Sequence, residues 1–144
     1  MIREVRNSDK GRLEEFFQSL DEETNKMFTH LLDVPFKRVR LFMEEDSDKI
    51  VYLIDNKIVG FAFLLRDPKY PGIPSLGLVV RPTFRNKGIG SSLVNRLVEL
   101  KVQKKYKRIY LTVFKSNVKA FEFYHKRGFK VIGETIARWE MTYE

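Results

Sequence analysis

The stretch Arg85-Asn86-Lys87-Gly88-Ile89-Gly90 decides how this sequence is interpreted. It follows the apolar residues 76–80 and precedes apolar positions at helical spacing in residues 93–100, so it predicts a strand, a glycine loop and a helix. Glycine lets the backbone approach a bulky anion with no Cβ in the way, and the N–H groups that open a helix lack intrahelical partners. A diphosphate would supply those partners.

Two familiar phosphate-binding loops do not fit this stretch. A dinucleotide-binding fingerprint needs a third glycine where this chain has Leu93. A Walker loop ends in Gly-Lys-Ser/Thr, whereas Lys87 precedes Gly88 instead of following it. The glycine pair therefore needs another interpretation.

The pattern Val80-x-Pro82-x-x-Arg85-x-x-Gly88-x-Gly90 closely resembles the coenzyme A loop of the GNAT superfamily of N-acetyltransferases, which is written Gln/Arg-x-x-Gly-x-Gly/Ala. The resemblance continues through a strand at residues 108–113, then Ser116-Asn117, residues 120–124 and Arg127-Gly128-Phe129. In many GNAT enzymes this order and spacing carries a cofactor-binding Asn and a catalytic Tyr. The match extends from about residue 76 to about residue 132, and the N-terminal half matches only in outline.

The resemblance implies an α/β fold, a mixed and mostly antiparallel sheet of six or seven strands flanked by helices. Its central parallel pair of strands would splay apart and hold the pantetheine arm of coenzyme A as a peptide strand is held. Gly77, inside the first strand of that pair, predicts a bulge where the splay begins.

The same resemblance implies a set of cofactor-binding residues. Arg85 would fasten the loop and reach toward a phosphate, and the strand edge at residues 78–80 would hold pantetheine. The backbone N–H of Val79 would polarise the thioester carbonyl, which makes Val79 a candidate catalytic residue through its backbone. The cofactor-binding set is Leu78, Val79, Val80, Arg85, Asn86, Lys87, Gly88, Ile89, Gly90, Ser91 and Asn117.

Asn117 and Tyr124 each have two interpretations. Asn117 precedes apolar positions at the start of a predicted helix, so it is a candidate helix cap as well as a pantetheine ligand. Tyr124 is a candidate buried aromatic in a chain with 12 Phe and 6 Tyr. The resemblance makes it the general acid that protonates the departing thiolate.

The sequence does not identify a single residue as the general base. An alkylamine has a pKa near ~10.4, so most acceptors must lose a proton before they attack. In several GNAT peptide acetyltransferases a Glu on the strand before the Asn takes that proton, but the matching position here is Thr112, which cannot. The alternatives are a water relay or a surface side chain from the set Glu44, Glu45, Asp67, Glu134 and His30.

Composition narrows the class of protein. The 144 residues, 43% of them hydrophobic, predict a single domain over residues 1–144. The longest apolar run, residues 58–65, is far shorter than the ~20 residues of a membrane span, and the start lacks a signal-peptide pattern. With no cysteine and only His30 and His125 as imidazoles, we expect a cytoplasmic protein without a metal.

The net charge of +8 raises the question of a nucleic-acid partner. The basic run at residues 101–108 ends a predicted helix, where cations complement the helix dipole, and its aromatics do not interleave as a stacking platform would. The phosphates of coenzyme A explain a basic rim equally well. A nucleic-acid partner is therefore the weakest option.

Periodicity and turn residues predict the remaining elements. A short strand at residues 2–5, a helix from residue 8 or 9, and a helical region at residues 22–32 precede an ambiguous segment at 36–43. Strands at residues 49–54 and 57–65 form a hairpin about Asp55-Asn56. The later elements are a strand at 73–80, a helix at 88–104, a strand at 108–113, a helix at 117–127 ended by Gly128, and strands at 129–136 and 138–143.

The resemblance to the GNAT superfamily implies an acetyl-CoA-dependent N-acetyltransferase that moves acetyl directly to an amine in a ternary complex. The acceptor is a protein N-terminus, a lysine or a small amine, and a homodimer is left open. The basic charge disfavours a polyamine, since a cationic acceptor needs an acidic groove. The alternative is a catalytically silent acyl-CoA-binding regulatory module, which the Thr112 substitution supports.

Overall fold

The computed structural model describes residues 1–22, 24 and 47–144. The segment predicted as ambiguous at residues 36–43, and most of the helical region predicted at 22–32, lie outside the described residues. The candidate bases His30, Glu44 and Glu45 lie outside them as well.

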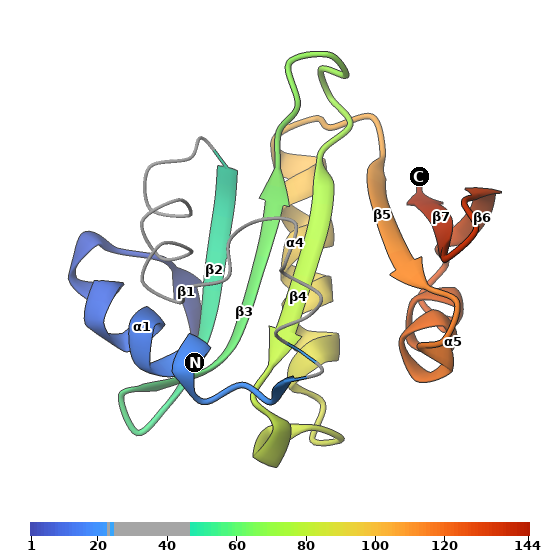
Figure 1. Ribbon diagram of the computed structural model, residues 1–144. Coiled ribbons are helices and arrows are strands. Elements are labelled where there is room, and N and C mark those ends of the chain that lie inside the picture. The colour runs from blue at the N-terminus through green and yellow to red at the C-terminus, as the bar shows by residue number, and fades with distance from the viewer. Residues whose placement is uncertain (23, 25–46) are drawn as a thin grey trace. The chain divides into compact units, whose positions relative to one another are not determined.

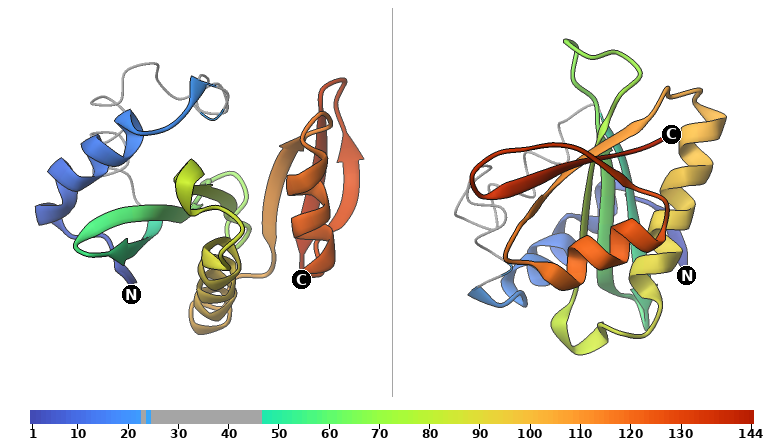
Figure 2. Two further views of the ribbon diagram at one scale, coloured as in Figure 1. Left: turned by 90° about the horizontal axis from the view of Figure 1, so that it is seen from below. Right: turned by 90° about the vertical axis from the view of Figure 1, so that its right-hand side faces the viewer.

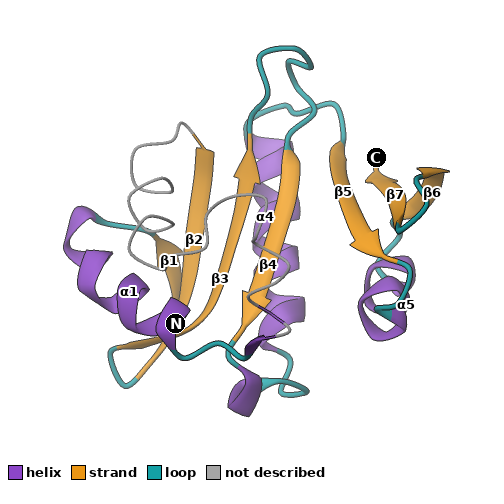
Figure 3. Ribbon diagram, viewed as in Figure 1, coloured by secondary structure: helices purple, strands orange, loops and turns teal. Residues whose placement is uncertain are grey.

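The described strands form a mixed sheet in the order β1-β2-β3-β4-β5-β7-β6, seven strands within the described part of the chain. Figures 1 and 3 show these strands with the helices α1, α4 and α5. The predicted sheet of six or seven strands with a parallel pair is confirmed. The strands are β1 (Ile2–Glu4), β2 (Ser47–Ile54), β3 (Lys57–Leu65), β4 (Ser75–Val80), β5 (Ile109–Phe114), β6 (Lys130–Glu134) and β7 (Arg138–Tyr143). The helices are η1 (Asn7–Asp9), α1 (Lys10–Gln18), η2 (Pro82–Phe84), α4 (Ile89–Gln103) and α5 (Val118–Lys126).

The chain divides into two compact units, which are described separately. The first contains Met1–Phe63 and Leu78–Val98, and the second contains Leu64–Gly77 and Glu99–Glu144. The single domain over residues 1–144 stays a prediction.

The hairpin of the first unit is built on a tight two-residue turn. Asp55 and Asn56 have φ of 49° and 63°, the left-handed pair that matches the twist of the β2 and β3 strands. Short polar side chains tolerate this backbone conformation better than most others. The predicted Asp55-Asn56 turn is therefore confirmed.

Helices α1 and α4 cover opposite faces of β3 in the first unit. The ring of Phe17 on α1 meets that of Phe61 edge-on at 5.8 Å. A Cβ on the neighbouring Gly60 would lie 2.9 Å from Leu93 Cδ1 and 3.1 Å from Ile89 Cγ2 on α4. Since successive strand residues point to opposite faces, the two helices sandwich the strand, as Figure 2 shows. The core of this unit is apolar on both sides of β3.

The β5, β6 and β7 strands of the second unit are antiparallel, and their register decides which side chains share a face. Ile109 pairs with Tyr143 and Phe114 with Arg138, so every residue of β5 has a partner on β7. Helix α5 packs on one face, where Phe121 contacts Trp139 at 6.0 Å between ring centroids. The register of β6 against β7 slips between Val131 and Gly133, a bulge that the periodicity of the sequence does not predict.

Glycine ends α5 as predicted. Gly128 has φ of 93°, and its N–H donates to His125 O at 3.1 Å, so the left-handed residue that closes a helix is present.

The parallel contact between β4 and β5 is short. The register between these two described strands joins one pair, Ser75 with Tyr110, and Tyr110 N–H donates to Pro74 O at 2.9 Å. Helix α4 makes the crossover, as predicted. Strand β4 runs through Gly77 without a break, so the bulge at Gly77 stays a prediction.

Asp9 is a fully buried carboxylate at the start of α1, and it is neutralised by arginine. Arg3 donates two hydrogen bonds to it, at 2.7 and 2.8 Å, and the backbone N–H of Arg6 donates a third at 2.8 Å. The hydrogen bonds from Arg3 lower the pKa of Asp9 against the opposing effect of burial. This network joins β1 to the helix that follows it.

We expect Asp9→Asn to destabilise the protein by about 3 kcal/mol at pH 7. The substitution leaves the Arg3 guanidinium, which is largely shielded from solvent, without its anionic partner. A depressed carboxyl pKa contributes stability above the unfolded pKa of ~3.9, and that stability is lost as the pH falls through the folded value. Urea unfolding at pH 7 and pH 3 should show the difference between wild type and variant shrinking at pH 3. The exposed Asp67→Asn is the control. Equal losses in both variants at pH 7 would contradict the role of Asp9.

Candidate functional site

The loop between β4 and α4 has the backbone conformation that the glycine pattern predicts. Asn86 and Gly88 both lie in the left-handed region, with φ of 62° and 80°. A Cβ on Gly88 would meet nothing within 4 Å, so open space lies next to the backbone at this point. The loop can therefore present its backbone directly to a ligand.

Helix α4 begins directly after this turn. The backbone hydrogen bond at its start runs from Ser92 N–H to Gly88 O at 3.1 Å. The Ser92 hydroxyl donates to the same oxygen. The N–H groups of Ile89 and Gly90 precede this backbone bond in the first turn of α4, where backbone N–H groups have no intrahelical acceptor. Such N–H groups, together with the helix dipole, favour an anion.

Arg85 holds the loop to the rest of the first unit. Its Nε donates to Val80 O at 3.2 Å and its Nη2 donates to Thr24 Oγ1 at 2.8 Å. Its Nη1 lies 3.9 Å from Asp21 Oδ2. These contacts agree with the expected fastening of the loop, whereas reaching a phosphate stays a prediction.

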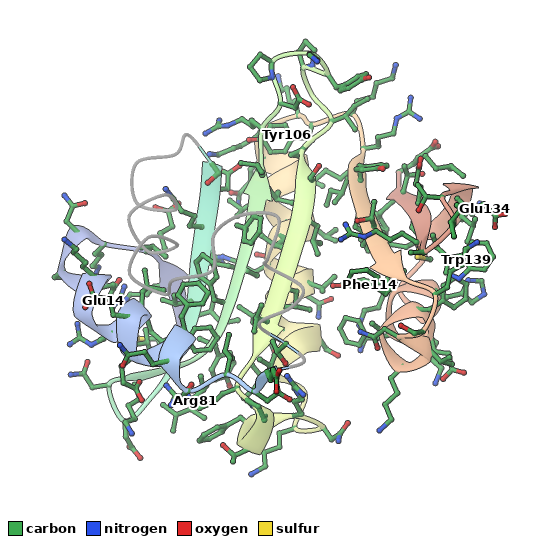
Figure 4. The ribbon with its side chains drawn as sticks, viewed as in Figure 1. Glu14, Arg81, Tyr106, Phe114, Glu134 and Trp139 are labelled. Carbon is green, nitrogen blue, oxygen red and sulfur yellow. The ribbon has the colours of Figure 1, made fainter. Side chains whose placement is uncertain are left out.

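Arg81, which the sequence analysis did not single out, anchors the start of the same loop (labelled in Figure 4). Its guanidinium donates to both carboxylate oxygens of Glu15, at 2.9 and 2.7 Å, and to Ile58 O at 2.7 Å. Its backbone N–H donates to Val59 O at 2.8 Å. The hydrogen bonds from Arg81 lower the pKa of Glu15. Because Glu15 is 66 residues away in the chain, no local pattern reveals this pair.

Asn117 caps α5 in the second unit. Its side-chain oxygen accepts a hydrogen bond from Ala120 N–H at 3.2 Å, so the capping interpretation is confirmed. Its NH₂ group makes no hydrogen bond to another residue that the structure describes. The amide can therefore cap the helix and still donate to a ligand, which stays a prediction.

Tyr124 lies on α5 with its ring buried and its residue 9% exposed. The rings of Phe123 and Phe129 meet it edge-on at 5.2 and 5.4 Å. Burial raises the pKa of the Tyr124 phenol, so it keeps its proton throughout the physiological range. Within the described part of the chain its hydroxyl has no hydrogen-bond partner, which leaves the proton available.

Of the alternative bases that the structure describes, two have local roles. Glu134 forms an ion pair with Lys115 at 3.3 Å, and Asp67 accepts a hydrogen bond from Lys69 N–H at 2.9 Å within its own turn. Thr112 is exposed on β5, and its hydroxyl accepts from Arg138 Nη1 at 3.3 Å.

The predicted residues fall into two sets. Residues 78–80 and the loop 85–91 belong to the first unit, where Arg85 joins Val80 to the loop. Asn117 and Tyr124 belong to the second unit, where Asn117 is the N-cap of α5 and Tyr124 lies on its second turn.

The described residues contain no group of three or more His, Cys, Asp or Glu side chains placed to hold a metal ion. Within the same part of the chain, no helix is long and apolar enough to span a membrane.

A model of the acetyltransferase (GNAT) family matches residues 13–129 of this chain. A spermine/spermidine N(1)-acetyltransferase of Bacillus subtilis is 30% identical over 106 residues, which cover 69% of this chain and 62% of that protein. An L-ornithine N5-acetyltransferase of Arabidopsis thaliana is 30% identical over 114 residues, 74% of this chain and 46% of that protein. This chain thus spans less than two thirds of the length of either relative.

Solved structures show the same fold. The PaiA N-acetyltransferase of Thermoplasma acidophilum, determined with coenzyme A, superposes with a TM-score of 0.80 at 22% identity over 100% of this chain and 98% of its own. The GNAT domain of S. lividans PAT gives 0.86 at 14% identity over 99% and 88%. At these identities the likeness concerns the fold alone.

Proposed function

The chain belongs to the acetyltransferase (GNAT) family, and from that premise we propose that it is an acetyl-CoA-dependent N-acetyltransferase acting on a primary amine. The observation that carries the proposal is the loop from Arg85 to Ser91, with left-handed backbone at Asn86 and Gly88, open space at Gly88 and the start of α4 behind it. This loop is where the diphosphate of coenzyme A binds. The backbone N–H groups at the start of α4 and the helix dipole supply the attraction.

The reaction is a direct transfer. The amine nitrogen attacks the thioester carbon, an N–C bond forms, the C–S bond breaks, and the sulfur leaves as a thiolate. The backbone N–H of Val79 donates to the oxygen that becomes negative in the transition state. A donor that belongs to the backbone of a strand is fixed before the charge develops, which is why such a group is effective in this role.

Tyr124 donates the proton that the thiolate takes up, and the NH₂ of Asn117 donates to the pantetheine arm. The raised pKa makes the Tyr124 phenol a weaker acid. Burial also disfavours a charged thiolate, so burial alone does not make the proton transfer from the phenol to the sulfur harder. The packing of the ring against Phe123 and Phe129 holds the hydroxyl in one position.

The acceptor is a primary amine, either a small molecule or a polypeptide. The named substrates of the two relatives, spermine or spermidine and L-ornithine, are both alkylamines. They are therefore the first probes, alongside a peptide with a free N-terminus and one with an internal lysine. Turnover of acetyl-CoA with any of them separates an enzyme from a catalytically silent acyl-CoA-binding module.

We expect coenzyme A to raise the melting temperature of the wild type, because a ligand bound by the folded state stabilises it. Gly88→Ala should lower or abolish this rise, since it adds a methyl group in the ligand's space and strains a φ of 80°. The matched control is Gly11→Ala on α1, where a Cβ also meets nothing within 4 Å. We expect Gly11→Ala to keep the rise. A folded Gly88→Ala variant with the wild-type rise would show that the loop does not bind the diphosphate.

We expect Tyr124→Phe to slow the chemical step by about ten- to a thousand-fold, because it removes the proton donor and keeps the ring. Affinity for acetyl-CoA and the melting temperature should change little, since the hydroxyl has no hydrogen bond to a described residue. The measurement is single-turnover transfer together with thermal unfolding. Tyr143→Phe, which also lies against Phe129, is the control. Wild-type chemistry in Tyr124→Phe would remove Tyr124 from the catalytic residues.

A further inference from the structure

Glu140 lies in the middle of a polar sheet face in the second unit. On β7 it is paired with Thr112 of β5 on one side and with Gly133 of β6 on the other. Side chains of directly paired residues lie on the same face of a sheet. The position of Thr112, which the family resemblance associates with a proton acceptor, is therefore next to Glu140, a residue of another strand on the same face.

The neighbours of Glu140 leave room for its carboxylate. A Cβ on Gly133 would lie 3.3 Å from Glu140 Oε2, so the absence of a side chain at this bulge gives the carboxylate its place. Tyr110, two residues before Thr112 and paired with Thr142, lies on the same face of the sheet as Glu140. Burial first, and then the charge of Glu140, raise the pKa of Tyr110.

Two basic residues share this face with Glu140. Arg138 donates to Thr112 Oγ1 at 3.3 Å and its guanidinium lies over the ring of Phe114 at 4.3 Å. Lys130 is paired with Thr142 at the far end of β6. Glu140 is half-buried and within reach of solvent.

The opposite face of these strands is occupied by α5. Trp139, the neighbour of Glu140 along β7, contacts Phe121 of α5 and Lys115 lies over its ring at 4.7 Å. Glu134 pairs with Trp139 across the sheet and forms an ion pair with Lys115, so it lies on the same face as Trp139; both Glu134 and Trp139 are labelled in Figure 4. Of the two carboxylates, Glu140 therefore lies on the face that α5 does not cover.

We propose that Glu140 is the general base that takes a proton from the acceptor amine, a proposal that rests on the proposed N-acetyltransferase function. A protonated alkylamine first gives one proton to the Glu140 carboxylate, which later releases it to water. The neutral amine then attacks the thioester carbon and the C–S bond breaks. Tyr124 gives its proton to the departing sulfur, and the second proton of the attacking nitrogen restores the Tyr124 phenol.

The charge of Glu140 also suits the acceptor before reaction. An ammonium group is attracted by a carboxylate and is repelled by Arg138, so it is directed toward Glu140 on this face. The hydroxyl of Thr112 cannot take a proton from an ammonium ion at neutral pH. In this chain the proposed base therefore lies on β7 instead of β5, at the position paired with Thr112 and on the same face of the sheet.

The test is Glu140→Gln, assayed with whichever of spermidine, L-ornithine and the two peptides the wild type acetylates fastest. We expect kcat/KM to fall by about 10²- to 10³-fold at pH 7, while coenzyme A still raises the melting temperature as in the wild type. The loss should shrink toward pH 10, because the variant then meets amine that is already neutral, given an amine pKa near ~10.4. A merely structural role predicts a loss of the same factor at every pH.

Three further variants make the test specific. Glu122→Gln changes the same charge at an exposed position on α5 and should leave kcat/KM unchanged. Tyr110→Phe should reduce kcat/KM by a smaller factor than Glu140→Gln, since it removes a neighbouring hydroxyl on the same face and keeps the carboxylate. Glu134→Gln tests the competing carboxylate. A loss in Glu134→Gln with full activity in Glu140→Gln, or a loss in Glu140→Gln that does not vary with pH, would overturn the assignment.

Failure of the proposal and failure of the proposed function give different results. If the wild type turns over an amine and Glu140→Gln does so equally well, Glu140 is not the base and the N-acetyltransferase assignment stands. If the wild type acetylates none of the four amines and coenzyme A leaves its melting temperature unchanged, the proposed function fails, and the role of Glu140 fails with it.

Discussion

The ion pair between Arg81 and Glu15 is the constraint on which the geometry of the first unit's loop depends. It fixes the end of β4 against α1 with two hydrogen bonds, and a third to Ile58 O fixes it against β3. The Arg81 side chain is 11% exposed, so this charge is stable only while Glu15 and the carbonyl accept its protons. The loop that follows therefore starts from a rigid point, and Arg85 holds its next segment in the same way.

The second unit uses the alternation of β7 to divide two tasks between two faces. Trp139 lies on the face that carries α5, which presents Asn117 and Tyr124. Glu140 lies on the other face with Thr112, and the bulge of β6 places a glycine beneath its carboxylate. Side chains along a strand alternate between its two faces. The helix that carries the proposed acid therefore packs on one face of β7, and the proposed base lies on the other.

The interpretation drawn from the sequence succeeded where the signal is local. The Asp55-Asn56 turn, the glycine that ends α5 and the helix cap at Asn117 are confirmed, because each depends on backbone preferences of the residue itself. The loop at Gly88 belongs to the same class, since its left-handed backbone follows from a glycine between a strand and a helix. The sequence does not predict the bulge in β6, because the residue pattern of this strand by itself does not mark Gly133 as a point where the register shifts.

What the sequence by itself determined is the order of the strands and helices and the position of the glycine loop, which follow from hydrophobic period and turn chemistry. It also determined family membership, because the loop and the residues around Asn117 recur as a spaced pattern. Tertiary structure alone decided that Arg81 pairs with Glu15 and that Glu140 is the neighbour of Thr112. Both are contacts between segments far apart in the chain, and only strand register and the packing of α1 against the sheet bring such residues together.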